Sequence, residues 1–162
     1  MKKMISEILE EASKLKNREK KIEFLRAYDS ITLRRILSAV YDERCKWLLP
    51  DSDPPYHAAH PSFGHEKLYS ESRKLYLFLE GGNPNLKQNR RETMFIEFLE
   101  SIHPREASMM LKIKKKKMPY PGINEDLVRE AFPDLLLPKE VAQERTEEPT
   151  HVENTEAPQA LG

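Results

Sequence analysis

The sequence predicts an all-α fold, a compact bundle of six or seven short helices that forms a single domain over residues 1–138. Apolar residues recur at steps of three and four along several segments, as they do in a helix with one buried face. Proline, glycine and capping side chains stand between these segments, where helices begin and end. The length of 162 residues suits one domain with a modest core.

Three short helices account for the first part of the chain. The first extends from about residue 4 to residue 15, the second covers residues 17–28, and the third covers about residues 31–43. Asp29 or Ser30 can cap the third helix, because a side-chain oxygen there accepts hydrogen bonds from amides of the first turn. The predicted buried stripe of this helix consists of Leu33, Ile36, Leu37, Val40 and Tyr41.

A proline-rich extended strap follows at residues 46–64. It contains four prolines. Because each proline fixes φ and lacks an amide donor, the segment cannot be helical throughout. It is long for a structureless loop in a compact domain. We therefore expect Trp47, Leu48, Leu49 and Tyr56 to anchor the strap against the helices.

The remaining helices have clear start and stop signals. The fourth covers about residues 65–80 and is closed by Gly81 and Gly82, since glycine accepts the left-handed conformation that ends many helices. Capping residues and prolines at first helical positions mark the later starts. These are Asn83 and Pro84 for the fifth helix, Pro104 for the sixth and Asn124 for the seventh.

The net charge of zero hides an acidic end. Residues 139–162 contain six glutamates against one lysine and one arginine, a balance of −4, so residues 1–138 carry +4. This end is polar and nearly free of large apolar residues, a composition that cannot bury enough surface to fold. The sequence therefore predicts a mildly basic domain followed by a disordered acidic tail.

The composition also indicates a cytoplasmic protein. Cys45 is the only cysteine, so no internal disulfide can form, and this fits a reducing compartment. No apolar run approaches the roughly 18–20 residues that cross a bilayer. The first residues are too acidic for a secretory signal. We expect no membrane association, and nothing in the sequence indicates the oligomeric state.

A metal site is not predicted. The strap and the position after it hold three histidines, His57, His60 and His65, with Cys45 upstream. Imidazole binds zinc well, but their spacing is not that of a helical pair and no carboxylate lies among them. Glu100 and His103 have the Glu-x-x-His spacing of carboxylate-bridged metal bundles, which require a second such pair that the chain lacks. No cofactor is expected.

Catalytic motifs are also missing from the sequence. No serine stands in a Gly-x-Ser-x-Gly context, and no motif surrounds Cys45. The glycines of "EGGNPN" are better explained by one helix ending and another beginning than by a phosphate-binding loop. We therefore expect no enzyme.

Basic clusters are the remaining candidates for function. Four consecutive lysines end the predicted sixth helix, where the helix dipole favours cations, so solvation alone can explain them. They can also neutralise phosphates without reading bases, with an aromatic ring nearby to stack on a base. An acidic protein partner, including this chain's own tail, is a further alternative. The nucleic-acid-binding candidates are Arg90, Arg91, Lys112, Lys114, Lys115, Lys116, Lys117 and Tyr120.

A series of motifs resembles a family of small uncharacterised proteins from tailed bacteriophages of the myovirus type, those of cyanobacteria and their relatives. It covers about residues 4–137, and the tail departs from it. The matching residues are Asp29 and Ser30; Leu49, Pro50, Pro54, Pro55 and Tyr56; Arg91, Glu92, Phe95, Ile96, Leu99, Glu100, His103, Pro104, Glu106 and Ala107; and Glu130, Ala131, Phe132 and Pro133. The resemblance implies an infected bacterial cell and carries no activity, cofactor or catalytic residue.

The leading hypothesis from the sequence is a non-enzymatic phage accessory protein that binds a protein partner in the host cytoplasm, within a DNA- or transcription-associated assembly. The segment from Arg90 to Pro133 would supply the surface. The expected partner-binding residues are Trp47, Tyr56 and Phe132. The alternative is a sequence-independent nucleic-acid-binding protein, and the third reading is a metal-dependent enzyme that uses the histidines of the strap.

Overall fold

The computed structural model describes residues 2–139, and the predicted all-α fold is confirmed there. The helices are α1 (Ile5–Lys14), α2 (Arg18–Ala27), α3 (Ile31–Tyr41), α4 (Lys67–Glu71), the 3₁₀ helix η1 (Ser72–Phe78), α5 (Gln88–Ser101), α6 (Pro104–Lys114) and α7 (Glu125–Ala131). No helix in this range is long and apolar enough to cross a bilayer. The predicted disorder of the acidic tail lies outside the described residues from position 140 onward.

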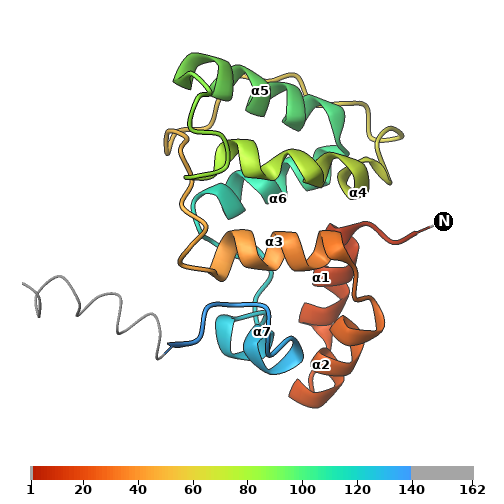
Figure 1. Cartoon of the computed structure of the whole chain (residues 1–162). Helices are drawn as coiled ribbons and strands as arrows, with labels where there is room; N and C mark the ends of the chain where they lie inside the picture. The colour runs from red at the N-terminus through yellow and green to blue at the C-terminus, as the bar shows by residue number, and fades with distance from the viewer. Residues whose placement is uncertain (1, 140–162) are drawn as a thin grey trace, which may run out of the picture.

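Helix α6 lies at the centre of the bundle. It packs against α1, α3 and α5, and α3 in turn packs against η1. In Figure 1, α4 and α5 lie on one side of α3, while α1, α2 and α7 form the opposite end of the molecule. One continuous core of buried side chains connects these helices, with Leu9, Leu33 and Phe98 among its members.

Local capping chemistry places several of the helix starts where the sequence predicts them. The Ser30 hydroxyl accepts a hydrogen bond from the Leu33 amide at 3.0 Å, so Ser30 caps α3. The Asn124 side chain accepts from the Leu127 amide at 2.9 Å and caps α7. Helix α6 has Pro104 at its first position. Each cap satisfies an amide that has no partner within the helix.

The predicted helix over residues 65–80 is wrong in its extent. The chain forms the short α4 and then η1, which ends at Phe78 before the two glycines. The Phe78 carbonyl accepts from the Leu48 amide, and the Glu80 amide donates to the Lys46 carbonyl, both at 2.8 Å. This pairing with the strap requires extended backbone at Leu79, so tertiary contacts end the helix early.

The fifth helix also begins later than predicted. Helix α5 starts at Gln88, whereas Asn83 and Pro84 belong to a preceding turn. The Asn83 side chain accepts from the Asn85 amide at 3.2 Å, and the Asn83 carbonyl accepts from the Leu86 amide at 3.1 Å. Asparagine favours such local turns as much as helix caps, which explains the wrong prediction.

A buried carboxyl joins α6 to the start of α1. Glu106 is fully buried, and its Oε2 accepts a hydrogen bond from the Ser6 amide at 2.9 Å. Within residues 2–139, Glu106 Oε1 and the Ser6 hydroxyl have no hydrogen-bond partner. Burial raises the pKa of Glu106 to about 7, and the bond from the Ser6 amide only partly opposes this shift.

Candidate functional site: an arginine-rimmed groove between α3 and η1

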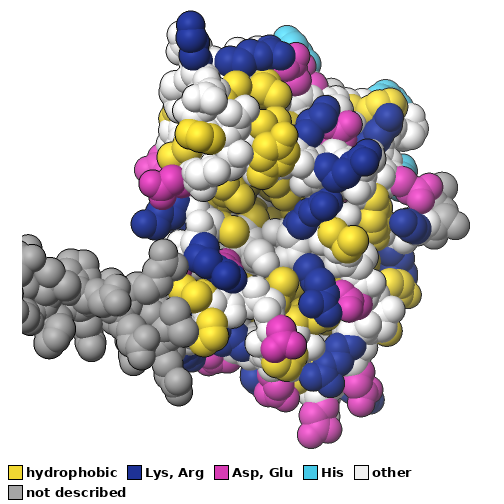
Figure 2. Space-filling model, viewed as in Figure 1, with side chains coloured by type: hydrophobic (Ala, Val, Ile, Leu, Met, Phe, Trp, Pro, Cys, Tyr) yellow, Lys and Arg dark blue, Asp and Glu magenta, His cyan; other side chains and the backbone are white. Residues whose placement is uncertain are grey.

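An open groove of about 440 Å³ lies between α3 and η1. Aliphatic side chains of both helices line it, together with Leu135 from the segment after α7. Ile31 is 69% exposed and Tyr76 is 54% exposed, and both line the groove. Among residues 2–139 only Phe63 is a further large hydrophobic residue with such exposure. Figure 2 shows hydrophobic side chains running across this face.

Arginines surround this apolar surface. Arg35 donates to the Ser72 hydroxyl at 3.0 Å and Arg73 donates to the Ser70 carbonyl at 3.2 Å, and both also line the groove. Neither forms an ion pair within the described residues. Arg34 differs, because it forms a bidentate pair with Asp29 at 2.7 and 2.9 Å. The groove is therefore apolar inside and positively charged at its rim.

One face of α3 supplies much of this surface. Ile31, Arg35 and Ser38 are four and three residues apart, so they share one side of the helix. The predicted buried stripe of the same helix lies on the opposite side. The sequence therefore contained a signal for the groove, an apolar residue and an arginine away from the core face, which our sequence-based prediction missed.

Cys45 lines the groove but lacks the environment of a nucleophile. Burial, aided by the nearby Asp42 carboxylate, raises the pKa of its thiol. Reactive cysteines require the opposite, a pKa lowered by neighbouring cations. The Cys45 thiol therefore stays protonated at neutral pH and contributes packing.

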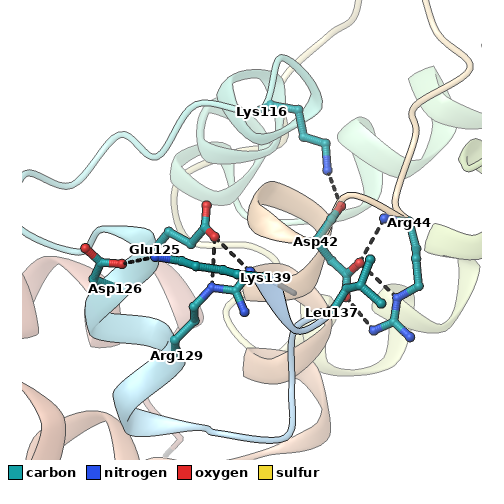
Figure 3. A network of polar contacts seen from close by, with 8 residues as sticks. All are labelled: Asp42, Arg44, Lys116, Glu125, Asp126, Arg129, Leu137 and Lys139. Atoms are coloured by element: carbon teal, nitrogen blue, oxygen red, sulfur yellow. Dashed lines mark hydrogen bonds and ion pairs between the residues drawn. The ribbon is translucent and has the colours of Figure 1, made fainter. Parts of the chain in front are cut away.

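The Asp42 carboxylate holds together the chain segments beside the groove (Figure 3). It accepts bonds from the Arg44 side chain at 3.0 and 2.6 Å and from the Leu137 amide at 3.3 Å. The Asp42 carbonyl accepts from Lys116 Nζ at 2.8 Å. Burial raises the pKa of the Asp42 carboxyl, but the bonds from Arg44 and Leu137 outweigh it, so the pKa lies below its ordinary value.

We expect Asp42→Asn to lower the free energy of unfolding by about 1–3 kcal/mol at neutral pH, because it leaves Arg44 and the Leu137 amide with a weaker acceptor. The depressed pKa means that this contribution is present above the ordinary pKa of 3.8 and is lost as the pH falls through the folded-state pKa. Urea denaturation measures the effect. Asp126→Asn, which removes the exposed pair with Lys139, is the control and changes stability by less than about 0.5 kcal/mol. Equal effects of both variants contradict the role of Asp42.

Comparison with known families assigns the chain to a group without an established activity. Residues 8–120 match the model of a family of unknown function, DUF6433. This range is well over half of the chain. The chain belongs to the DUF6433 family. No curated protein matches the sequence.

The DUF6433 match includes both walls of the groove, α3 and η1, but ends before Leu135. Several of the motif residues within the match have structural roles. His103 Nδ1 accepts from the Arg105 amide at 3.1 Å and caps α6, while Glu106 supports the start of α1. Phe95 and Leu99 are buried. These four residues of the segment from Arg90 to Pro133 therefore supply core and caps, and the binding surface predicted for the segment stays a prediction.

The lysine run does not form one basic patch in this DUF6433 chain. Lys114 is 5% exposed, and its ammonium donates to the carbonyls of Pro50, Asp51 and Ser52 at 2.6, 3.3 and 2.8 Å. Lys116 has a left-handed φ of 60° and donates to the Ala39 carbonyl at 3.2 Å as well as to that of Asp42. Burial lowers the pKa of both lysines. The prediction of phosphate contact is corrected for Lys114, because its buried ammonium group holds the strap. Lys116 is exposed and donates to the end of α3, so phosphate contact by Lys116 stays a prediction.

The other predicted nucleic-acid contacts are scattered. Arg91 is buried and donates to the Leu77 carbonyl at 3.0 Å, so its prediction is also corrected. Lys115 pairs with Asp53 at 3.1 Å. Arg90 pairs with Glu97 at 3.7 Å, whereas Lys112 and Lys117 are exposed. Tyr120 is half-buried, and burial raises the pKa of its hydroxyl to about 12.

The predicted partner-binding aromatics all pack against the core, but only Phe132 is fully buried. Phe132 is buried, with the Arg34 guanidinium 4.9 Å from its ring centroid. Trp47 donates to the Ala39 carbonyl at 3.0 Å and packs edge-on against Phe95, which confirms that it anchors the strap. Tyr56 packs against the same core. The prediction for Phe132 is corrected, because its ring is buried in the bundle. Trp47 and Tyr56 are only partly buried, so partner binding by these two residues stays a prediction.

The histidines of the strap are not gathered into a metal centre. Within residues 2–139, no group of three or more His, Cys, Asp or Glu side chains could hold a metal ion. His60 bonds to the Ser62 hydroxyl at 2.8 Å, and the rings of His65 and His103 lie 4.9 Å apart, edge to face. His103 Nε2 lies 2.9 Å from the Pro61 carbonyl, so this pair of rings joins the strap to α6.

Proposed function

We propose that the protein is a non-enzymatic binding module, and that the groove between α3 and η1 holds a segment of another protein that carries acidic residues around apolar ones. The observation that most supports this proposal is the combination of exposed Ile31 and Tyr76 with arginines at the rim of the groove. Large exposed apolar side chains gathered in one place are characteristic of interaction sites. The guanidinium groups of Arg35 and Arg73, which form no ion pair with residues 2–139, favour carboxylates, which they bind through two parallel hydrogen bonds.

The motif series supports assigning this action to a cell infected by a tailed phage, as an accessory function in the host cytoplasm. A partner within a DNA- or transcription-associated assembly fits the same proposal. Nucleic acid itself has less support as the ligand, because the ammonium groups of Lys114 and Lys116 already bind backbone carbonyls. The groove is also more apolar than a surface that follows a phosphate backbone.

A random-peptide display library screened against the full-length protein tests the proposal. We expect the enriched peptides to contain glutamate or aspartate beside large apolar residues, and to lose at least tenfold in affinity for the double variant Arg35→Glu/Arg73→Glu. Ile31→Ser/Tyr76→Ser weakens binding independently and leaves the buried core intact. The double variant Lys20→Glu/Lys112→Glu makes the same charge change at exposed sites outside the groove and binds as the wild type does. No enrichment, or equal binding by groove and control variants, contradicts the proposal.

A further inference from the structure

We infer that the acidic end of this same chain, residues 140–162, occupies the α3–η1 groove and competes there with the partner segment. The inference rests on the proposed function, because it assigns to that binding site an occupant tethered to it. Three features of the chain carry it: the charge of the tail, the point at which the tail leaves the domain, and the residues that accompany its glutamates.

Charge complementarity favours this occupant. Residues 140–162 contain six glutamates, and Arg145 is the only lysine or arginine among them. Arg35 and Arg73 stand at the groove without an ion pair inside the described residues. A guanidinium that has one neutral hydrogen-bond partner keeps further N–H donors for a carboxylate. The tail therefore supplies the charge that the rim lacks.

The tail also starts beside the groove. Leu135 lines the groove, and the Asp42 carboxylate fixes the Leu137 amide at 3.3 Å. Residue 140 is five positions beyond Leu135, a distance of at most roughly 18 Å along extended chain. A short tether of this kind gives a linked segment an effective concentration on the order of millimolar. Even weak contacts then keep the groove occupied for much of the time.

The tail has apolar residues next to its acids. Val141 follows Glu140, and Val152 precedes Glu153. This pairing matches a groove in which exposed apolar side chains lie beside arginines. By contrast, Lys112 and Lys117, two exposed lysines among the predicted nucleic-acid contacts, offer charge alone. The combination of both features favours the groove over the lysines as the place where the tail binds.

Photo-crosslinking in the full-length protein tests the inference. A photoreactive phenylalanine analogue replaces Tyr76 in the groove, or Phe63 of the strap as the matched exposed control. Mass spectrometry then locates the products. We expect intramolecular products between position 76 and residues 140–162, and none from position 63. The yield of these products falls at high salt, because salt screens the charges. The products are lost in the variant with six glutamines, which combines Glu140→Gln, Glu144→Gln, Glu147→Gln, Glu148→Gln, Glu153→Gln and Glu156→Gln. Crosslinks from position 76 to a second copy, or to no part of the tail, overturn the inference.

Affinity for a library-selected peptide separates failure of the inference from failure of the proposed function. We expect the chain with six glutamines to bind the peptide at least about twofold more tightly than the wild type, because a groove that the tail occupies for about half of the time or more loses apparent affinity by at least that factor. If the two chains bind the peptide with equal affinity, the tail does not compete for the groove, and the inference is wrong while the proposed function is unaffected. If neither chain binds any selected peptide but the crosslinks to the tail form, the proposed function fails while the tail remains the occupant.

Discussion

Replacing Glu106 with glutamine is expected to raise the free energy of unfolding by about 2–3 kcal/mol above pH 7. The folded-state pKa of Glu106 is about 7, against an ordinary value of 4.5. Between these values the folded protein holds a proton that the unfolded chain has released, so stability falls as the pH rises. The difference of about 2.5 units corresponds to roughly 3 kcal/mol, all of it lost once the pH exceeds 7.

Glutamine reproduces the shape of the protonated side chain. Its carbonyl oxygen accepts from the Ser6 amide, and its amide group offers a donor to the Ser6 hydroxyl, which has no partner within residues 2–139. Urea denaturation at pH 5 and pH 8 measures the effect. We expect the free energy of unfolding of the wild type to be lower at pH 8 than at pH 5, because Glu106 is deprotonated at the higher pH. In Glu106→Gln this contribution of Glu106 to the pH dependence is absent. Glu23→Gln, on the exposed face of α2, is the matched control. A Glu106→Gln protein that is less stable than the wild type at pH 8 contradicts the account.

Replacing Lys114 with methionine is expected to cost about 2–4 kcal/mol of stability. The three strap carbonyls at 2.6, 3.3 and 2.8 Å lose their donor, and bonds to a charged group contribute more than neutral ones. Methionine keeps most of the aliphatic stem, so the loss of packing is small. Because the strap depends on this ammonium group, we also expect faster amide hydrogen exchange in residues 46–64.

Lys117→Met is the matched control, since Lys117 belongs to the same run and is exposed. It changes the free energy of unfolding by less than about 0.5 kcal/mol and leaves exchange in the strap unaltered. Thermal or urea denaturation of both variants gives the comparison. If the two substitutions have equal effects, the four lysines are equivalent solvated charges and the structural role of Lys114 is wrong.

Local signals were sufficient to predict much of the fold. The hydroxyl of Ser30, the amide of Asn124 and the ring of Pro104 act within one helical turn, so sequence alone locates the starts of α3, α6 and α7. Predictions failed where distant residues decide or where one local signal fits two structures. The strap ends η1 at Phe78, and a turn around Asn83 delays α5.

The basic run illustrates the same limit. Its lysines are consecutive in the sequence, but α6 ends at Lys114 and the chain turns at Lys116. Neighbouring side chains of the run therefore point in different directions. Their carbonyl partners lie more than 60 residues earlier. No local pattern encodes those contacts. The groove is also assembled from distant segments, although Ile31 and Arg35 lie away from the core stripe of α3 in the sequence pattern.

Chemical-shift mapping of a library-selected acidic peptide on the full-length, isotope-labelled protein tests the central claim most directly, namely that the protein acts through the α3–η1 groove. We expect the perturbed amides to cluster in residues 31–39, 72–79 and around Leu135, with little change in residues 46–64 beyond the pairing at Trp47 and Leu48. Perturbations centred on Lys112 and Lys117, or on the histidines of the strap, with the groove unchanged, would contradict it.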